Sequence, residues 1–375
     1  MSRRLGIVGG GQLGGFICQA ARSLGIQTTV LSKSVEGLAA TYADAIIEAA
    51  FDDQQAVDQL IEASDVVTFE LEDVPVETLQ KLAAHPRVEV FPRPSTMLLL
   101  QNKGQQKDWL VEHGFPTAPH LRFDNGLDAA QALNKFGQSF VIKTQRGGYD
   151  GLGVKLVRDG AVPDGYDDVP TIAEAAVQDF VEIAVLIARN PAGETVHYPV
   201  FQSTFDDAGN VVRRIVAPAP IDEQTAHRAI ELAREIVTKF DGVGIFAVEY
   251  FLTATQLLVN EIAPRVHNVG HMTIEASAES QFAQHIRAVA GLPLVEVDTI
   301  TPAVMENLLW DEQIAAACAA QKVLDEQHAN VHWYGKSAPR PLRKMGHLTT
   351  LGDSLTQAGV RADRAMQHLQ QEPAR

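Results

Sequence analysis

Strands and helices alternate through the first ninety residues of this chain. Short apolar segments typical of strands are separated by stretches with helical spacing, and these segments are Leu5–Val8, Gln27–Leu31, Ala45–Glu48, Asp65–Phe69 and Val88–Phe91. Each intervening helix brings the next strand back parallel to the last, so the pattern predicts a doubly wound parallel sheet. Pro92 and Pro94 follow and end this unit.

In the rest of the chain, the expected strands are long and few helices separate them. The expected strands are Phe140–Lys143, Val154–Val157, Ile183–Arg189, Val196–Phe205, Val211–Ala217, Gly244–Phe251 and Leu257–Ile262. Strands that follow one another closely favour an antiparallel sheet. A length of 375 residues fits two or three domains. We expect an α/β (α+β) fold with domains at 1–103, 104–180 and 181–375.

Composition and charge exclude several classes of protein. Acidic residues number 47 against 31 Lys and Arg, a formal net charge of −16. Such a chain is unsuited to non-specific nucleic-acid or anionic-membrane binding, which needs basic surface. The two cysteines, Cys18 and Cys318, lie too far apart for a thiolate zinc motif or a disulfide framework. With no apolar run of membrane-spanning length and no signal-peptide pattern, we expect a cytoplasmic enzyme.

A glycine motif follows the first strand. Gly9, Gly11 and Gly14 fit the pattern GxGxxG at the start of the first helix, where free N–H groups and the helix dipole attract phosphate. A dinucleotide site also needs an acid after the second strand, and Ser32 and Lys33 stand there instead. A phosphate site that does not bind NAD fits better. A tight turn that binds nothing is the alternative.

A second glycine segment is more informative. Gly147–Gly153 holds four glycines in seven positions and joins two strands, whereas a Walker loop joins a strand to a helix. Such a loop exposes backbone N–H groups to phosphates. Lys143, at the end of the preceding strand, would place a cation beside them. An ordinary hairpin with a glycine turn is the alternative.

A pair of carboxylates comes next. In a hairpin that turns at Thr253–Gln256, Glu249 and Glu261 would face each other within apolar strands. Like charges directly opposed across a strand pair are destabilising, and burial raises the cost. A divalent cation would remove that penalty, and oxygen ligands that include Asn260 suit Mg²⁺. Two exposed acids on a loose hairpin are the alternative.

Two further segments are rich in polar side chains. Ala263–His271 gathers Arg265, His267 and Asn268 just after the second of these strands, a cluster suited to binding anions and developing negative charge. His332–Lys336 starts a basic stretch within an acidic chain. Taken alone, this stretch could also be a solvated surface.

Together, the glycine loop between strands, its lysine and the carboxylate pair resemble the ATP-grasp superfamily. Within it, the chain is similar to the 5-(carboxyamino)imidazole ribonucleotide synthetase family over nearly its whole length. The motifs that carry this similarity are Gly9–Gly14, Thr68–Glu72, Gly147–Gly151, Asn260–His271, Tyr334–Lys336 and Arg343–His347.

The resemblance implies an ATP-grasp ligase of purine biosynthesis. ATP and bicarbonate would form carboxyphosphate, and aminoimidazole ribonucleotide would be carboxylated on its amine. By matched position, Asp150, Arg265, His267 and Lys336 would be catalytic, and Glu249 and Glu261 would bind Mg²⁺. ATP would be held by Lys103, Lys143, Gly147, Gly148, Tyr149, Asp150, Gly151, Gly153, Gln178, Asp179, Phe180, Val181, Glu182, Asn260 and Glu261. The ribonucleotide would be held by Gly11, Gln12, Leu13, Glu70, Glu72, Tyr149, Lys336 and Arg343.

The resemblance also implies a homodimer and a functional link to the mutase that follows in the pathway. It places the adenine-binding hinge at Gln178–Val181, where the family begins with Glu and has a longer link to the equivalent of Glu182. Other ATP-grasp carboxylases or ligases are the nearest alternative. Leu152, where the family carries a cation, and the absence of a family His near Thr204 motivate a second one, a weakly catalytic nucleotide-binding protein. An NAD dehydrogenase is a third.

Overall fold

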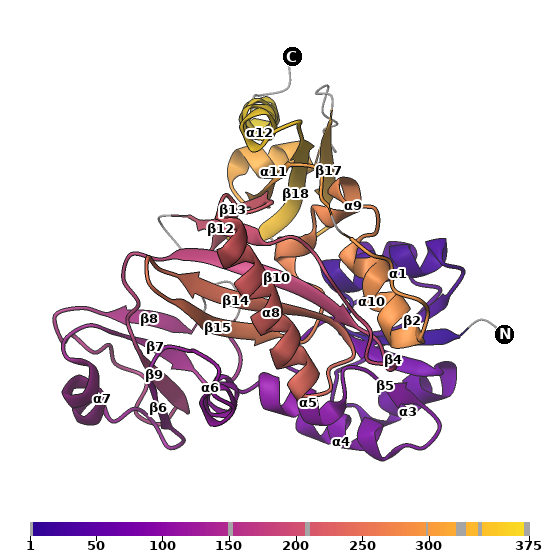
Figure 1. Ribbon diagram of the computed structural model, residues 1–375. Helices are drawn as coiled ribbons and strands as arrows, with labels where there is room; N and C mark the ends of the chain where they lie inside the picture. The colour runs from indigo at the N-terminus through magenta and orange to yellow at the C-terminus, as the bar shows by residue number, and fades with distance from the viewer. Residues whose placement is uncertain are drawn as a thin grey trace.

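The N-terminal part of the molecule is a parallel sheet with helices on both faces (Figure 1). The computed structural model describes residues 3–148, 153–206, 211–297, 299–319, 328–336 and 340–370. The strand order is β3-β2-β1-β4-β5, which confirms the predicted doubly wound sheet. Its elements are β1 (Arg4–Val8), α1 (Gln12–Ser23), β2 (Gln27–Ser32), α2 (Leu38–Tyr42), β3 (Ala45–Glu48), α3 (Gln54–Ala63), β4 (Val66–Phe69), α4 (Val76–Ala84) and β5 (Glu89–Val90).

A small antiparallel sheet forms the middle of the chain and lies at the lower left of Figure 1. Its strand order is β6-β9-β7-β8, and the helix α7 packs on it through Ala132, which joins a core of Phe123, Phe140 and Val157. Two helices lead into it from the first sheet. The bounds are α5 (Pro94–Leu100), α6 (Lys103–Glu112), β6 (His120–Phe123), α7 (Ala129–Phe136), β7 (Phe140–Thr144), β8 (Val154–Val157) and β9 (Thr171–Ala175).

The third sheet is the largest and is antiparallel throughout. Its order is β15-β14-β10-β12-β13-β16-β18-β17, with β11 paired to β10. Its elements are β10 (Val181–Arg189), β11 (Thr195–His197), β12 (Phe201–Phe205), β13 (Val212–Ala217), α8 (Glu223–Lys239), β14 (Gly244–Leu252), β15 (Leu257–Ala263), η1 (Asn268–Gly270), α9 (Thr273–Ala276), α10 (Gln281–Ala290), β16 (Ala303–Leu309), α11 (Glu312–Ala319), β17 (Ala329–Trp333), β18 (Lys344–Leu351) and α12 (Leu355–Gln370). The antiparallel sheet expected from the long strands is confirmed.

Strand β10 explains why this sheet is covered on both faces. Alternate residues of a strand point to opposite faces, and in β10 both sets are apolar. Ile183 and Val185 pack with Ala233 of α8 in one core cluster. Ala184 and Leu186 belong to a second cluster on the other face, together with Phe282 of α10 and Phe16 of α1. The large sheet and the N-terminal sheet therefore share one core.

The joint between these two sheets also has a polar contact. The Oγ1 atom of Thr68 on β4 lies 2.8 Å from Nε2 of His285 on α10. The backbone N–H of Ile245 donates to Nδ1 of the same ring at 3.1 Å. Because Nδ1 accepts, the proton of the neutral ring is on Nε2, which donates to Thr68. This imidazole therefore ties β4 of the first sheet to β14 of the third.

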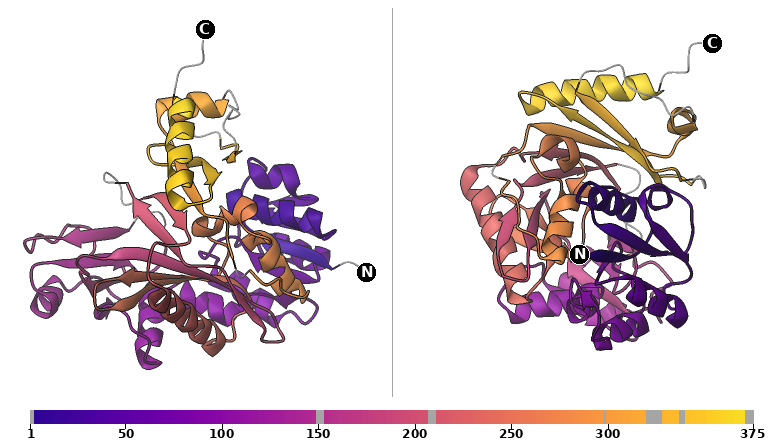
Figure 2. Two further views of the ribbon diagram at one scale, coloured as in Figure 1. Left: turned by 45° about the horizontal axis from the view of Figure 1, so that its top comes forward. Right: turned by 90° about the vertical axis from the view of Figure 1, so that its right-hand side faces the viewer.

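The last part of the chain covers the far end of the large sheet. Helices α11 and α12 pack on it, and Figure 2 shows α12 lying along β18. Ala358 and Ala362 of α12 are buried with Val304 of β16. Among the described helices, none combines the length and the apolar character that a membrane crossing requires.

One expected strand proved wrong. Val196–Phe205 was predicted as a single strand, but the structure divides it into β11 and β12. Pro199 lies between the two and has no N–H to donate to a ladder. The two halves therefore bond to β10 at separate places, with Val196 opposite Ala188 and Phe201 opposite Ala184.

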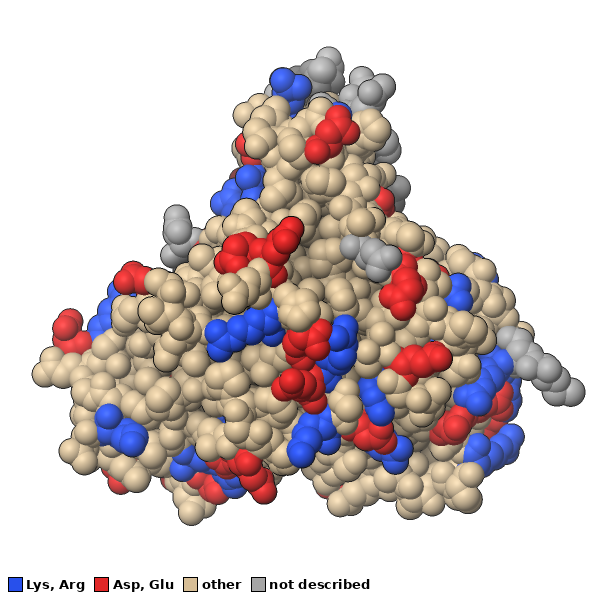
Figure 3. All heavy atoms as spheres, viewed as in Figure 1, with Lys and Arg blue, Asp and Glu red and all other residues tan. Residues whose placement is uncertain are grey.

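The surface agrees with the charge pattern of the sequence. On the face drawn in Figure 3, Lys and Arg side chains are scattered among Asp and Glu side chains. No broad basic area is visible on that face.

Candidate active site

A large cleft lies where the three sheets meet. Its volume is about 1060 Å³, and it is lined by strands of the two antiparallel sheets and by helices and loops that follow strands of the N-terminal sheet. Nine of the lining residues are Lys or Arg and seven are Asp or Glu, so the lining reverses the sign of the chain's net charge of −16. The cationic residues are Lys33, Lys103, Lys143, Lys155, Arg265, Lys336, Arg340, Arg343 and Lys344. A cleft of this charge is suited to anionic ligands.

The predicted carboxylate pair forms part of the cleft wall. Glu249 of β14 and Glu261 of β15 are register partners, as expected from the sequence. The register shifts directly beyond this pair, because Tyr250 pairs with Val259 and leaves Asn260 as an extra residue. Such a bulge re-aims side chains. Both Asn260 and its neighbour Glu261 line the cleft, although adjacent residues of a regular strand point to opposite faces.

Negative charge is concentrated at this pair. Burial and the charge of Glu261 raise the pKa of Glu249 to about 7. Burial and the charge of Glu249 raise the pKa of Glu182, a residue of β10 that also lines the cleft. The carboxylate oxygens suit Mg²⁺. Within the described residues, no cluster of three His, Cys, Asp or Glu side chains could hold a metal alone. This donor set therefore fits an ion that keeps other ligands, such as phosphate oxygens or water.

Lys103 supplies the positive charge that faces Glu261. Its Nζ donates a hydrogen bond to Oε1 of Glu261. Burial opposes the charged form of both groups, but their mutual attraction outweighs it. The pKa of Lys103 is raised and that of Glu261 is lowered. Lys103 was expected to hold ATP. In this structure it lies at the carboxylate pair, at the first turn of α6.

Lys143 is held between two partners at the end of β7. Its Nζ donates to Oε2 of Glu174 at 3.2 Å and to Oδ1 of Asn260 at 3.0 Å. Lys107 of α6 approaches the same Oε2 at 3.5 Å, and burial lowers the pKa of Lys107 to about 8. The two lysines outweigh burial and hold the pKa of Glu174 below its usual range. Lys143 therefore enters the cleft as a positioned ammonium group.

Glu174 is a residue that sequence reasoning missed. It is buried in β9 and lines the cleft. Its second oxygen, Oε1, is buried without a hydrogen-bond partner among the described residues. A buried acceptor without a donor is costly and is therefore well placed to receive a donor from a ligand. An ionisable residue within the otherwise apolar segment Thr171–Ala175 was the signal that could have revealed it.

The second glycine segment lies only partly within the described residues. Strands β7 and β8 form the predicted antiparallel hairpin, and Gly147 and Gly148 line the cleft. Gly153 pairs through its carbonyl with the N–H of Thr144 and does not line the cleft. The expected ligands Tyr149, Asp150 and Gly151, and the departure at Leu152, lie outside the described residues.

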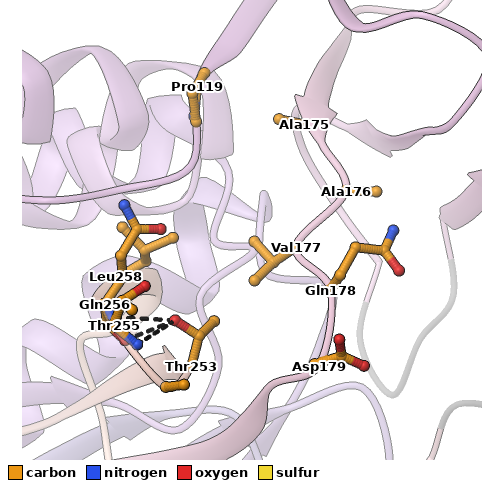
Figure 4. A pocket seen from close by; sticks show the side chains of 11 residues that line it. Pro119, Ala175, Ala176, Val177, Gln178, Asp179, Thr253, Thr255, Gln256 and Leu258 are labelled. Atoms are coloured by element: carbon orange, nitrogen blue, oxygen red, sulfur yellow. Dashed lines mark hydrogen bonds between the residues drawn. The ribbon is translucent and has the colours of Figure 1, made fainter.

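Only part of the predicted hinge lines the cleft. Gln178, Phe180 and Glu182 line the cleft, but Asp179 and Val181 do not. Asp179 has φ +48°, which turns the chain at that point. Its side chain borders a separate pocket of about 420 Å³ behind the hinge, where Val177 and Gln178 point in opposite directions (Figure 4). The lining instead begins four residues earlier, with Glu174, Ala175, Ala176 and Val177.

At the start of α1, two of the N–H groups that the first glycine motif offers are bonded to a protein carboxylate. The N–H of Gly11 donates to Oε2 of Glu70 at 2.7 Å, and the N–H of Gly14 also bonds to this carboxylate. Burial raises the pKa of Glu70, and the two N–H groups oppose the rise. A protein carboxylate therefore takes the place expected for a phosphate. Gln12, Leu13 and Glu70 line the cleft, but Gly11 does not.

Arg265 and His267 lie between the carboxylate pair and the far end of the cleft. Arg265 Nη2 is 2.8 Å from Oε1 of Glu72. His267 Nε2 is 3.5 Å from Oε1 of Glu249. Burial and the nearby Arg265 hold the pKa of His267 well below its usual range, so its ring is neutral near pH 7. Its Nδ1 has no partner among the described residues.

The basic stretch near the C-terminus belongs to the cleft and is not a solvated surface. Lys336, Arg340, Arg343 and Lys344 all line its far end. The Nζ of Lys336 donates to the backbone oxygen of Lys344 at 3.0 Å and lies 5.2 Å from the centre of the Tyr334 ring. These contacts fix a cationic region away from the carboxylate pair.

Comparison with known proteins first shows the class of protein to which this chain belongs. Residues 1–101 match the ribonucleotide synthetase preATP-grasp domain, 108–282 the ATP-grasp domain, and 303–361 the phosphoribosylaminoimidazole carboxylase C-terminal domain. The chain is an ATP-grasp protein. The N5-carboxyaminoimidazole ribonucleotide synthase of Brucella melitensis is 38% identical, over 92% of this chain and 96% of that protein. The chain therefore belongs to the N5-carboxyaminoimidazole ribonucleotide synthase family.

Two further similarities extend this result. The crystal structure of N5-carboxyaminoimidazole synthase from Aspergillus clavatus, in complex with ADP and 5-aminoimidazole ribonucleotide, is 30% identical. It covers 99% of both chains with a TM-score of 0.86. The phosphoribosylaminoimidazole carboxylase of Ogataea methanolica is 35% identical over 95% of this chain. The chain spans 67% of the length of that fungal relative.

Proposed function

We propose that this chain uses ATP and bicarbonate to carboxylate the amine of 5-aminoimidazole ribonucleotide, giving N5-carboxyaminoimidazole ribonucleotide, ADP and phosphate. The observation that carries the proposal is the division of one cleft into two regions. One holds the Glu249–Glu261 pair beside Lys143, and the other holds the cluster around Lys336. Two separate anions, a nucleoside triphosphate and a ribonucleotide, can thus be held with their reacting groups between the regions.

ATP occupies the first region in this proposal. Lys143 and the N–H groups of Gly147 and Gly148 face its phosphates, and the segment from Glu174 to Gln178 borders its base. The unpartnered Oε1 of Glu174 is an acceptor for the exocyclic amine of adenine. Glu249, Glu261 and Asn260 supply oxygen ligands for Mg²⁺. Mg²⁺ bound there would neutralise both the paired carboxylates and the phosphate oxygens of ATP.

The chemical steps proceed between the two regions. A bicarbonate oxygen attacks the γ-phosphorus, the bond to the β,γ-bridging oxygen breaks, and ADP and carboxyphosphate form. Arg265 holds the anionic oxygens of bicarbonate, and the neutral ring of His267 stands beside it as a hydrogen-bonding group. Carboxyphosphate then releases CO₂ and phosphate, and the amine nitrogen of the ribonucleotide adds to CO₂. Asp150 takes the proton that this nitrogen loses. Exclusion of water protects the reactive carboxyphosphate.

The ribonucleotide occupies the second region. Its phosphate contacts Lys336 and Arg343, because the N–H groups of Gly11 and Gly14 are already bonded to Glu70. Glu70 and Glu72 line the cleft as acceptors for the ribose hydroxyls, and Gln12 and Leu13 border the same ligand. This arrangement changes the role of the first glycine motif from phosphate binding to positioning of Glu70.

The remaining expectations from the resemblance are part of the same proposal. The chain divides into domains at 1–103, 104–180 and 181–375, acts as a homodimer in the cytoplasm, and passes its product to the following mutase. The three separate sheets support the domain division. The dimer, the compartment and the mutase link rest on the resemblance alone.

The experiment that tests the proposed function measures ADP release by the purified chain with Mg²⁺ and bicarbonate. The proposal predicts rapid ADP release when 5-aminoimidazole ribonucleotide is present and a much slower rate when it is omitted. An ADP-release rate that does not depend on the ribonucleotide would contradict the assignment of the second ligand. Absence of any ATP turnover would favour a nucleotide-binding protein without this activity.

A further inference from the structure

Three buried glutamines in this structure make the same unusual contact. Each uses its side-chain amide to bond both the N–H and the C=O of one distant residue. Gln106 bonds Ile262 in this way at 2.8 and 3.1 Å. Gln281 bonds His267 at 2.8 and 2.6 Å. Gln284 bonds Val295 at 3.1 and 2.6 Å. We call this contact a glutamine clamp.

The Gln106 clamp holds the strand that carries the metal ligands. Strand β15 is the last strand of the large sheet and pairs with β14, and on its other side Val259 forms an isolated bridge with Thr117. Its outer edge therefore has backbone groups without a strand partner. Helix α6 contacts this edge, and its polar side chains bond to the backbone there. Lys107 donates to the carbonyl of Val259 at 3.3 Å, and Gln106 clamps Ile262. These contacts fix the backbone on both sides of Asn260 and Glu261.

The Gln281 clamp holds the segment that follows β15. His267, its partner, stands beside Glu249. The helix bearing Gln281 is fixed in turn, since the N–H of Gln281 donates to Thr273 at 2.9 Å. Gly270 leaves space for the amide, because a Cβ at that position would lie 2.6 Å from the Cδ atom of Gln281. Close packing of this kind leaves His267 little freedom to shift.

We propose that Gln106 and Gln281 are positioning residues that hold Glu261 and His267 in their reactive places. This inference rests on the proposed function, because it takes Glu261 as a metal ligand and His267 as a group beside bicarbonate. Neither glutamine is among the residues that line the cleft. A bulge interrupts the ladder between β15 and β14 at Asn260, and the Gln106 clamp holds Ile262 from the other side. The Gln284 clamp has the same chemistry at Val295, which does not line the cleft.

The test makes one substitution at all three clamps. Methionine has nearly the length of glutamine and no amide, so Q281M and Q284M each remove two hydrogen bonds. Q106M removes the same two and a third, to the carbonyl of Leu100 at 3.1 Å. Mn²⁺ binding in the presence of ADP is measured by electron paramagnetic resonance, together with kcat and each KM. Q106M is expected to weaken Mn²⁺ binding at least about tenfold, the range found when a group that orients a metal ligand is lost. Q281M is expected to lower kcat and raise the KM for bicarbonate while Mn²⁺ affinity stays near the wild-type value.

Q284M is the matched control. It loses the same contact and is expected to lower the melting temperature while leaving Mn²⁺ affinity and every KM unchanged. Equal Mn²⁺ affinity in Q106M and Q284M would overturn the proposal for Gln106. Unchanged kcat and KM in Q281M would overturn it for Gln281. Should Q106M fail to fold, Q106N keeps an amide that is one methylene too short and supplies the same comparison.

Failure of the proposed function gives a different result. If the wild-type chain with ADP does not bind Mn²⁺, or if Glu261→Gln binds it equally well, the metal site is misplaced and the inference falls with it. If Glu261→Gln loses Mn²⁺ binding but Q106M does not, the metal site stands and only the positioning role is overturned.

Discussion

Glu249 and Glu261 lie directly opposite each other on adjacent antiparallel strands, inside a cleft whose other charged residues are mostly cationic. Burial and the charge of Glu261 raise the pKa of Glu249 to about 7. Sheets ordinarily avoid such a pair, because like charges opposed across strands are destabilising. A pair of this kind is retained where a cation bridges it, and the proposed metal site follows from this relationship.

The first prediction concerns Glu261 itself. Glu261→Gln removes one charge of the pair and one oxygen ligand, so turnover should fall at least about 100-fold, in the range found when charge stabilisation is lost at an active site. The fold should remain. The ion pair with Lys103 that is lost is only partly buried, and the loss is offset because the uncharged Gln side chain no longer repels Glu249. Steady-state kinetics and circular dichroism together measure this. A variant with a near-normal rate would show that the metal site lies elsewhere.

The second prediction concerns Lys103, whose ammonium group bonds Glu261. A metal ion can reach Glu261 fully only when Lys103 leaves. Lys103→Met should therefore increase the affinity of the nucleotide-free protein for Mn²⁺ about tenfold, which corresponds to about 1.4 kcal/mol. Lys103→Arg keeps the charge and should bind Mn²⁺ as the wild type does. Calorimetric titration measures both variants, and equal affinity in Lys103→Met and wild type would contradict this competition.

Much of the site could be predicted from the sequence, and the reason is local geometry. Glu249 and Glu261 flank a short turn, and a short turn fixes the register of a hairpin. The glycine motif at Gly9–Gly14 shows the limit of such local reasoning. Its local pattern fits a phosphate site, but the group that occupies the N–H of Gly11 is Glu70, 59 residues further along. No local sequence pattern indicates a hydrogen-bond acceptor that far along the chain.

Neither the turn within the hinge segment nor the glutamine clamps could be predicted from the sequence, for related reasons. A turn at Asp179, with φ +48°, leaves this residue out of the cleft lining, and one aspartate is only a weak sequence signal for such a turn. Gln106 clamps Ile262 across 156 residues. A glutamine in a polar helix is typical of an exposed surface, so only the fold reveals that this one is buried.

The third prediction concerns Glu174, the carboxylate between Lys107 and Lys143. Glu174→Gln leaves two buried lysines without their shared counter-charge, so the free energy of unfolding should fall by about 3 kcal/mol. The KM for ATP should rise about tenfold because Lys143 is no longer held at the phosphates. Glu279→Gln removes a partly buried partner of Arg287 at 2.8 Å and serves as the control. It should lower stability and leave the KM for ATP unchanged. A similar KM for ATP in both variants would contradict the role of Glu174.

The fourth prediction concerns pH. Burial lowers the pKa of His285 to about 4, below the unfolded value of about 6.5. The unfolded chain therefore binds a proton at His285 between these values, and the folded chain does not. Stability from this neutral ring is complete above pH 6.5 and is lost as the pH falls toward 4. The difference amounts to about 3 kcal/mol.

His285→Gln keeps an acceptor for Ile245 and a donor for Thr68 but cannot titrate. Its free energy of unfolding should fall less steeply between pH 6.5 and 4.5 than that of the wild type, as measured by urea denaturation. His227→Gln, on the exposed side of α8, controls for the loss of an imidazole. Parallel pH curves for wild type and His285→Gln would contradict the assignment of this ring.

The most direct test of the account follows the carbon of bicarbonate. The chain is incubated with ¹³C-bicarbonate, Mg²⁺, ATP and 5-aminoimidazole ribonucleotide, and the product is observed by ¹³C nuclear magnetic resonance while ADP is measured in the same sample. The account predicts a carbamate carbon on the ribonucleotide amine, formed in equal amount to ADP. ADP formed without a labelled carbamate, or a label on any other atom, would contradict it.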